Sequence, residues 1–357
     1  MMILSIIKII TALFISFITG IVITPFVTHY LYKHKMWKKR ARNEALGGGE
    51  TPIFNSLHKY KEVGTPRMGG IIIWASVLLT IFIIGLVAYI FPSPWTIKLN
   101  FLSQNQTWIP LFTLIAASLV GLVDDLLQIK GGGGYVAGGL SLSKRIALVL
   151  LIGFAGAWWF YFKLGTSSIV IPFYGDFDLG LLFIPFFMTV MLAIFSGGVI
   201  DGLDGLSGGI MASIFAAYAG IAFSQNQIDL AAFCAAIIGS ILAFLWFNIP
   251  PARFYMSETG IIGLTVTLSV VAFLTKAVIV LPVIAFPLIA TSASVIIQVA
   301  SKKIRGKKVF LVAPIHHHFE AIGWPAYKVT MRFWILGIVF ATIGMIISIA
   351  GNLAIIP

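Results

Sequence analysis

Ten long apolar runs divide this chain, and they constrain its fold more than any other feature. The runs cover residues 4–31, 69–91, 107–123, 145–163, 178–199, 208–224, 230–247, 259–275, 277–300 and 332–355. A helix that crosses a membrane needs about 20 mostly apolar residues. The chain is also 59% hydrophobic and only 10% charged. We therefore predict an all-α polytopic membrane protein with about ten spans, forming a single integral-membrane domain over residues 1–357.

The limits of these runs add detail to the prediction. The first run is too long for a secretory signal peptide and has no clear small-residue cleavage site, so it is predicted to be the first span. The eighth and ninth runs are nearly fused, and Lys276 marks the predicted turn between them. Cys234 is the single cysteine, which excludes an intrachain disulfide.

Basic residues predict the orientation of the spans. When the loops are numbered alternately from the first run, 20 of the 24 Lys and Arg residues fall on one side. Cytoplasmic loops of membrane proteins are enriched in Lys and Arg. The rich side is therefore predicted to be cytoplasmic, with both termini outside. The net charge of +12 follows from this distribution and does not indicate a nucleic-acid partner.

Five carboxylates lie at or just beyond the predicted cytoplasmic ends of spans. Asp124 and Asp125 are adjacent, and adjacent acids at a membrane boundary repel each other and are costly to desolvate. Mg²⁺, which prefers hard oxygen ligands, could compensate them; a solvated helix end is the plainer alternative. If their segment is helical, the spacing of Asp201 and Asp204 places both on one face, and the glycines beside them allow a ligand to approach. A Gly-Asp turn is the alternative there.

The stretch "WFNIPPARFYMSETG" holds the fifth carboxylate, Glu258, together with Asn248, Arg253 and Tyr255. Two prolines break the preceding helix. The aromatic ring of Tyr255 could stack on a base, and Arg253 could contact phosphate. An interfacial aromatic belt with a snorkelling arginine is the competing interpretation.

Two further segments could bind anions. Lys59, Lys61 and Arg67 precede a Gly-Gly pair that opens the second run, and such a turn at a helix N-terminus suits an anion. The alternative is a basic topology signal followed by an ordinary helix start. The stretch "KGGGGYVAGG" lacks the residue order of a phosphate-binding loop and is predicted to be a flexible linker.

Three consecutive histidines, residues 316–318, fall on the same predicted face as the five carboxylates. Three adjacent side chains cannot all face one metal ion in regular structure. We predict that they face phosphate oxygens from a shaped loop, not a helix, between Pro314 and Trp324. An interfacial histidine cluster is the alternative. Carboxylates, a divalent ion, basic loops and imidazoles together indicate phosphate chemistry.

The motifs "GTPRMGG", "LVDDLLQ", "DGLDGL", "FLWFNIPPA" and "APIHHHFEAIGWP" resemble those of the phospho-N-acetylmuramoyl-pentapeptide transferases. This family lies within the polyprenyl-phosphate N-acetylhexosamine-1-phosphate transferase superfamily. The resemblance covers about residues 55 to 335, and the histidine motif followed by "GWP" points to the muramoyl branch.

The resemblance implies a reaction and a location. Undecaprenyl phosphate attacks the β-phosphate of UDP-N-acetylmuramoyl-pentapeptide, UMP leaves and lipid I forms, with Mg²⁺ required. Two mechanisms remain open: direct attack by the lipid phosphate, and attack by an acidic side chain of the protein that forms a covalent intermediate. The protein would lie in the bacterial inner membrane with its site facing the cytoplasm. Membrane lipid is a further expected partner, and a homodimer is left open.

Residue roles are also implied by the resemblance. The expected catalytic residues are Asp124, Asp125, Glu258 and His317. The expected substrate-binding residues are Lys61, Asp201, Asp204, Asn248, Tyr255, His316 and His318. The expected metal ligands are Asp124, Asp125 and Glu258. Within these sets, Asp124 is the candidate base, and Tyr255 matches a phenylalanine that stacks on uracil.

The chain also departs from the family pattern. Glu258 stands for an aspartate, Gly198 for an asparagine, Gln128 for a lysine, Arg67 for a threonine and Ala326 for a glutamate. A transferase for UDP-N-acetylglucosamine and an inactive binding scaffold are therefore alternatives. A transporter is disfavoured, because transporters place ionisable groups near the bilayer midplane and the interiors of these runs hold almost none.

Overall fold

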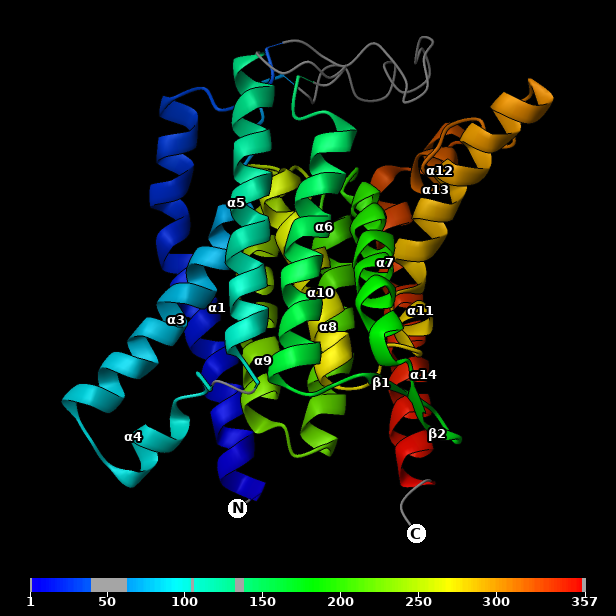
Figure 1. The fold of residues 1–357 in the computed structure, drawn as a ribbon. Coiled ribbons are helices and arrows are strands. Elements are labelled where there is room, and N and C mark those ends of the chain that lie inside the picture. Colours follow the sequence, from blue (N-terminus) through cyan, green and yellow to red (C-terminus); the bar gives the residue numbers. More distant parts are fainter. Residues whose placement is uncertain (1, 40–62, 104–105, 132–137, 355–357) are drawn as a thin grey trace.

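A computed structural model describes residues 2–39, 63–103, 106–131 and 138–354. Lys59, Lys61 and most of the glycine-rich stretch lie outside the described residues, so the predictions made for them stay predictions. Within the described ranges, nine helices are long and apolar enough to cross a membrane. They form one bundle of roughly aligned helices (Figure 1). The predicted class, an all-α polytopic membrane protein, is confirmed.

Most of the predicted runs appear as single helices with shifted ends. The long helices are α1 (Met2–Lys33), α3 (Ile71–Ile90), α5 (Trp108–Lys130), α6 (Leu142–Trp158), α7 (Phe183–Ser196), α8 (Leu206–Ser224), α9 (Ile228–Asn248), α10 (Ser257–Leu274), α12 (Phe286–Arg305) and α14 (Ala326–Leu353). The π-helical turn η1 (Trp159–Lys163) continues α6. The 3₁₀ turns η2 (Gly180–Leu182) and η3 (Gly197–Ile200) extend α7 at both ends.

Shorter elements connect them. These are α4 (Pro94–Leu99), α11 (Leu281–Ile284), α13 (Ile315–Ala321) and an antiparallel hairpin of β1 (Ser168–Ile171) and β2 (Gly175–Asp178). The hairpin and α4 were not predicted from the sequence. Both chain termini lie at the hairpin end of the bundle, while α5 ends and α6 begins at the opposite end (Figure 1). The predicted location of both termini outside the cell and the cytoplasmic side of the bundle stay predictions.

The centre of the bundle is α10. In its most apolar window 89% of residues are buried, against 17% in α1. Small residues make this position possible, because helices in lipid associate through close contacts at Gly, Ala and Ser. A Cβ on Gly263 would lie 2.1 Å from the Oγ of Ser118, and one on Gly121 would lie 2.2 Å from the carbonyl oxygen of Glu258. The α5–α10 contact therefore requires glycine at both positions.

The predicted ninth span differs from the structure. The turn at Lys276 is confirmed, with a positive φ of 51°. The run that follows is divided into α11 and α12, each with a proline in its first turn. A proline lacks the N–H that a continuous helix would need, so it suits a helix start and interrupts a helix interior. The prolines therefore explain where α11 and α12 begin. At its other end α12 continues past residue 300, and it leans away from the bundle (Figure 1).

Candidate functional site

The adjacent aspartates lie on the last two turns of α5, and both are fully buried. The carboxylate of Asp124 accepts hydrogen bonds from the backbone N–H of Leu140 and from Nε2 of Gln128 at 2.8 Å. It also pairs with Nη2 of Arg145 at 3.0 Å. A buried carboxylate is tolerated when it is paired and hydrogen-bonded. The structure therefore excludes the solvated helix end that was the plainer alternative.

The second aspartate anchors the start of α10. Oδ1 and Oδ2 of Asp125 accept from the backbone N–H groups of Glu258 at 3.3 Å and Thr259 at 2.9 Å. Oδ2 of Asp201 accepts from the N–H of Ser257 at 3.0 Å. The first N–H groups of a helix have no partner within it, and that end carries partial positive charge. Carboxylates from two distant segments therefore satisfy the first turn of α10.

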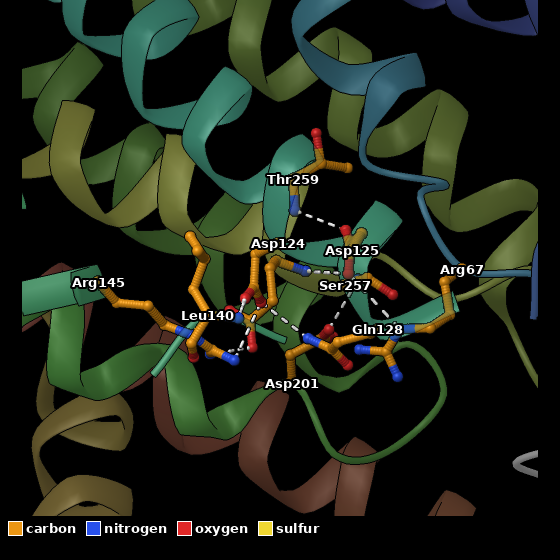
Figure 2. Close-up of polar contacts among 10 residues, drawn as sticks. Arg67, Asp124, Asp125, Gln128, Leu140, Arg145, Asp201, Ser257 and Thr259 are labelled. Atoms are coloured by element: carbon orange, nitrogen blue, oxygen red, sulfur yellow. Dashed lines mark hydrogen bonds and ion pairs between the residues drawn. The ribbon is translucent and has the colours of Figure 1, made fainter. Parts of the chain in front are cut away.

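Arginines neutralise this cluster. Nη1 of Arg145 pairs with Oε1 of Glu258 at 2.7 Å, so one guanidinium joins Glu258 to Asp124. The Arg145 side chain is only 12% exposed. Nε of Arg67 lies 3.5 Å from Oδ1 of Asp125. Figure 2 shows both arginines directed into the acidic cluster from opposite sides.

Arg145 was not predicted as a site residue. In the sequence it is one of many basic residues that determine topology, placed at the start of a predicted span. The family pattern has a lysine where this chain has Gln128, so a different cation could have been expected near the aspartate pair. Arg145, which follows the glycine-rich stretch, is that cation.

The predicted Mg²⁺ site stays a prediction. Within the described part of the chain, no group of three or more His, Cys, Asp or Glu side chains is arranged to hold a metal ion. Carboxylate oxygens of Asp124, Asp125 and Glu258 are the donor type that Mg²⁺ prefers. The donor chemistry fits the ion, but in this structure two guanidiniums supply the compensating charge.

The second pair of aspartates lies on a turn between η3 and α8, so the segment is not helical there and the structure shows the alternative, a Gly-Asp turn. Oδ1 of Asp201 accepts from Oγ of Ser207 at 2.6 Å, and burial raises the pKa of the Asp201 carboxyl above its usual value. Oδ2 of Asp204 accepts from the N–H of Ala252 at 3.3 Å. The glycine-rich sequence favours the turn because Gly205 has a positive φ of 75°.

Asn248 joins this turn to the loop that follows α9. Its Oδ1 accepts from the N–H of Gly205 at 2.9 Å, and its Nδ2 donates to the carbonyl of Phe254 at 2.8 Å. The side chain is 3% exposed. The amide therefore positions two loops of the site, and its predicted contact with substrate stays a prediction.

The Gly-Gly pair at the start of α3 does not offer free N–H groups to an anion. Gly69 donates to the carbonyl of Tyr255 at 2.8 Å, and Gly70 donates to that of Met256 at 3.0 Å. A Cβ on Gly70 would lie 2.3 Å from Cα of Gly260. The predicted anion-binding turn is therefore wrong at these glycines, where close packing against α10 explains the motif. Base stacking by Tyr255 stays a prediction.

The histidines lie on a helix, which corrects the predicted loop. Residues 315–321 form α13 directly after Pro314, which has the extended conformation usual at an N-cap. The rings of His316 and His317 are buried, with centroids 4.3 Å apart. A Cβ on Gly202 would lie 2.5 Å from Nε2 of His316 and 2.8 Å from Nε2 of His317. Both rings therefore pack directly against the turn that carries Asp201 and Asp204.

Different contacts fix the other histidine nitrogens. Nδ1 of His317 lies 2.7 Å from Oε2 of Glu320, one turn further along α13. Nδ1 of His318 accepts from the N–H of Leu311 at 3.2 Å. The Glu320 contact holds the His317 ring with Nε2 toward the Asp201–Asp204 turn. The three rings therefore have three different environments.

These contacts form one continuous site. Asp125 binds the first turn of α10, Ser257 in that turn binds Asp201, and Gly202 packs against His316 and His317. The helix ends and loops that carry the described site residues lie at the end of the bundle away from the termini (Figure 1). The roles predicted for these residues stay predictions, and Lys61 lies outside the described residues.

Fold and site together define a polytopic membrane protein with a buried acidic and basic cluster at one end of its helix bundle. Comparison with known proteins makes the family explicit. Residues 107–276 match the family described as glycosyl transferase family 4, a range that includes both aspartate pairs and Glu258.

Relatives match nearly the whole chain. It is 32% identical over 350 residues to a protein of Geobacillus thermodenitrificans named phospho-N-acetylmuramoyl-pentapeptide-transferase, covering 96% of this chain and 98% of the relative. It is 34% identical over 341 residues to a protein of the same name from Clostridium perfringens, covering 94% and 97%. The chain belongs to the phospho-N-acetylmuramoyl-pentapeptide transferase family.

Proposed function

We propose that this protein transfers phospho-N-acetylmuramoyl-pentapeptide from its UDP donor to undecaprenyl phosphate, giving lipid I and UMP in peptidoglycan biosynthesis. Family membership over almost the whole chain supports this reaction. The observation that carries the proposal is the first turn of α10, where Asp125, Asp201 and Glu258 meet within one hydrogen-bond network. The site would face the cytoplasm, where a UDP-linked donor is available, in the inner membrane of a bacterium.

The charges of the site suit a phosphoryl transfer. An oxygen of the lipid phosphate forms a bond to the β-phosphorus of the donor, the bond from that phosphorus to UMP breaks, and UMP leaves with the electron pair. Charge develops on the phosphoryl oxygens, and preorganised cations stabilise it. The guanidinium of Arg145 can offer paired N–H donors to phosphate, a geometry that Lys lacks.

Asp124 is the proposed base for the lipid phosphate. It is buried beside Arg145, which keeps a negative carboxylate tolerable in this setting. His317 would act next to the Asp201–Asp204 turn, because Glu320 fixes one ring nitrogen and leaves the other toward Gly202. A carboxylate that orients an imidazole in this way selects its tautomer.

Mg²⁺ is proposed as the cofactor, with Asp124, Asp125 and Glu258 as the residues that would hold it. When bound, the ion would polarise phosphate oxygens as a Lewis acid. In the structure Arg145 forms ion pairs with two of these three carboxylates, those of Asp124 and Glu258. The guanidinium and the ion would therefore compete for the same oxygens. Arg145 is therefore proposed to preserve the positions of Asp124 and Glu258 when no ion is bound.

The decisive experiment is release of UMP by the purified protein from the muramoyl-pentapeptide donor and undecaprenyl phosphate. We expect turnover that stops when Mg²⁺ is chelated and that Asp124→Asn and Asp125→Asn abolish while the protein stays folded. Wild-type rates in these variants, or full activity in excess chelator, would contradict the proposed site. UDP-N-acetylglucosamine in a parallel assay tests the alternative donor, and turnover with that sugar alone would replace the muramoyl assignment.

A further inference from the structure

The outer half of α12 presents apolar side chains away from the bundle. Ile296, Ile297 and Ile304 are 64%, 48% and 81% exposed, and their spacing places them along one side of the helix. In Figure 1 this part of α12 leans outward and reaches beyond its neighbours at the site end of the bundle. Large apolar residues in such a position contact lipid or a partner.

The opposite, polar side of α12 is covered by the chain itself. Oε1 of Gln298 accepts from the N–H groups of Val309 and Phe310, and its Nε2 donates to the carbonyl of Phe310 at 2.8 Å. Oγ of Ser301 donates to the carbonyl of Lys307 at 2.9 Å. The segment after α12 therefore folds back along its polar side. α12 and this segment therefore present the isoleucine side outward, with charged side chains beside it.

That charge is entirely positive. Lys302, Lys303, Arg305, Lys307 and Lys308 are all exposed and occur within seven residues. No Asp or Glu occurs in the sequence between Glu258 and Glu320. Among the described residues, none of the five side chains forms a salt bridge. Elsewhere in the site region, by contrast, arginines are paired with carboxylates.

We propose that α12 and residues 306–311 form a binding surface for anionic phospholipids, with the isoleucines in the acyl region and the five cations at the headgroup phosphates. An apolar stripe beside Lys and Arg is the composition of helices that lie in the membrane interface. Lys and Arg side chains near an anionic membrane surface are attracted to its headgroup phosphates. This surface is separate from the transferase site, so the inference does not depend on the proposed function.

The surface is linked to the histidine helix. Oγ of Ser294 on α12 accepts from the N–H of Ile315, the first residue of α13, at 2.9 Å. The N–H of Leu311 donates to Nδ1 of His318 at 3.2 Å. A lipid that holds residues 306–311 against α12 would therefore also hold the start of α13. Anionic lipid should stabilise the placement of His316 and His317 beside Gly202.

The test compares two triple variants of the full-length protein. Lys302→Gln/Lys303→Gln/Lys308→Gln removes three cations from the surface. Lys33→Gln/Lys35→Gln/Lys39→Gln removes three exposed lysines near the end of α1 and serves as the matched control. Binding of phosphatidylglycerol and phosphatidylcholine to detergent-purified protein is measured by native mass spectrometry. Hydrogen exchange of residues 307–318 is measured in nanodiscs of each lipid.

We expect the wild type and the control to prefer phosphatidylglycerol. The surface variant should bind it roughly 10- to 100-fold more weakly, as expected for the loss of three such charges. Exchange at Leu311 and Ile315 should be slower in phosphatidylglycerol nanodiscs for the wild type and the control, but not for the surface variant. Equal lipid preference in all three proteins would overturn the proposal. The proposal would also be overturned if inorganic phosphate slowed hydrogen exchange at Leu311 and Ile315 as much as phosphatidylglycerol does. That result would show that the surface binds a soluble anion.

Discussion

The start of α10 and the outer half of α12 lie at the same end of the bundle but neutralise charge in opposite ways. At α10, Asp125 and Asp201 bind backbone N–H groups, and Arg145 and Arg67 bind carboxylates, so charges are satisfied inside the protein. At α12, five exposed cations have no acidic partner among the described residues.

This difference separates two uses of charge. Charges at the start of α10 are fully or largely buried, so they hold a fixed geometry and are costly to remove one at a time. Charges on α12 are exposed, so each contributes little to folding and is available to bind from outside. The following predictions test that contrast, beginning with the largest expected effect.

Arg145→Gln should have the largest effect, because it leaves the fully buried Asp124 and the partly exposed Glu258 without their shared cation. Removing one partner of a buried ion pair costs about 3–5 kcal/mol, and we expect turnover to fall about 100-fold or more. Thermal unfolding and UMP release measure the two effects. Lys144→Gln, an exposed neighbour on α6, is the control and should change neither.

The same pair of variants tests competition with Mg²⁺ without measuring activity. If the ion and Arg145 share oxygens, Mg²⁺ should raise the melting temperature of Arg145→Gln more than that of Lys144→Gln. Equal shifts in both proteins would mean that the guanidinium does not occupy ligand oxygens.

Gly121→Ala should destabilise the protein by about 1–3 kcal/mol or prevent folding, because the added methyl would meet the carbonyl of Glu258. Gly85→Ala on α3 is a suitable control, since a Cβ there meets nothing within 4 Å. Denaturation in detergent compares the two. Equal stability of both variants would show that α5 and α10 can separate at low cost.

Glu258→Asp should have a smaller effect, within about tenfold in turnover, because the carboxylate is kept and only the 2.7 Å contact with Arg145 is weakened. Aspartate is also the residue of the family pattern at this position. The ratio of UMP release rates is the measurement. A variant with no activity would show that the site geometry depends on the longer side chain.

Glu320→Gln should have the smallest effect, a few-fold loss of turnover, because an amide oxygen can still accept from Nδ1 of His317 while its charge is lost. The pH profile of turnover is the informative readout, since the carboxylate favours the protonated imidazole. An unchanged profile would show that Glu320 has no influence on His317 during catalysis.

Much of the fold could be predicted because hydrophobic run length is a strong local signal. The runs at 208–224 and 230–247 became α8 and α9 with ends shifted by only one or two residues. The prediction of a single span at 277–300 was wrong. The run has the length and composition of a span, but two prolines and packing against α14 divide it into α11 and α12. The histidine helix was missed because seven residues carry too little periodicity to distinguish a short helix from a shaped loop.

The sequence predicted which residues belong to the site better than it predicted which residues they contact. Asp124, Asp125, Asp201 and Glu258 were chosen correctly as residues that meet. Their partners were not foreseen, because the contacts that matter join residues far apart in the chain, such as Arg145 with Glu258. The roles of Gly69 and Gly70 changed from anion binding to close packing for the same reason.

The sequence by itself determined that this chain is a helical membrane protein, that its charges gather at one end of the spans, and that its motifs are those of a transferase family. These are properties of local composition and residue order, which any fold of the chain must satisfy. Only the tertiary structure decided that Asp125 and Asp201 hold the first turn of α10 and that Arg145 lies between Asp124 and Glu258. Burial makes each of these charges require a partner, and the packing of the helices selects which partner is within reach.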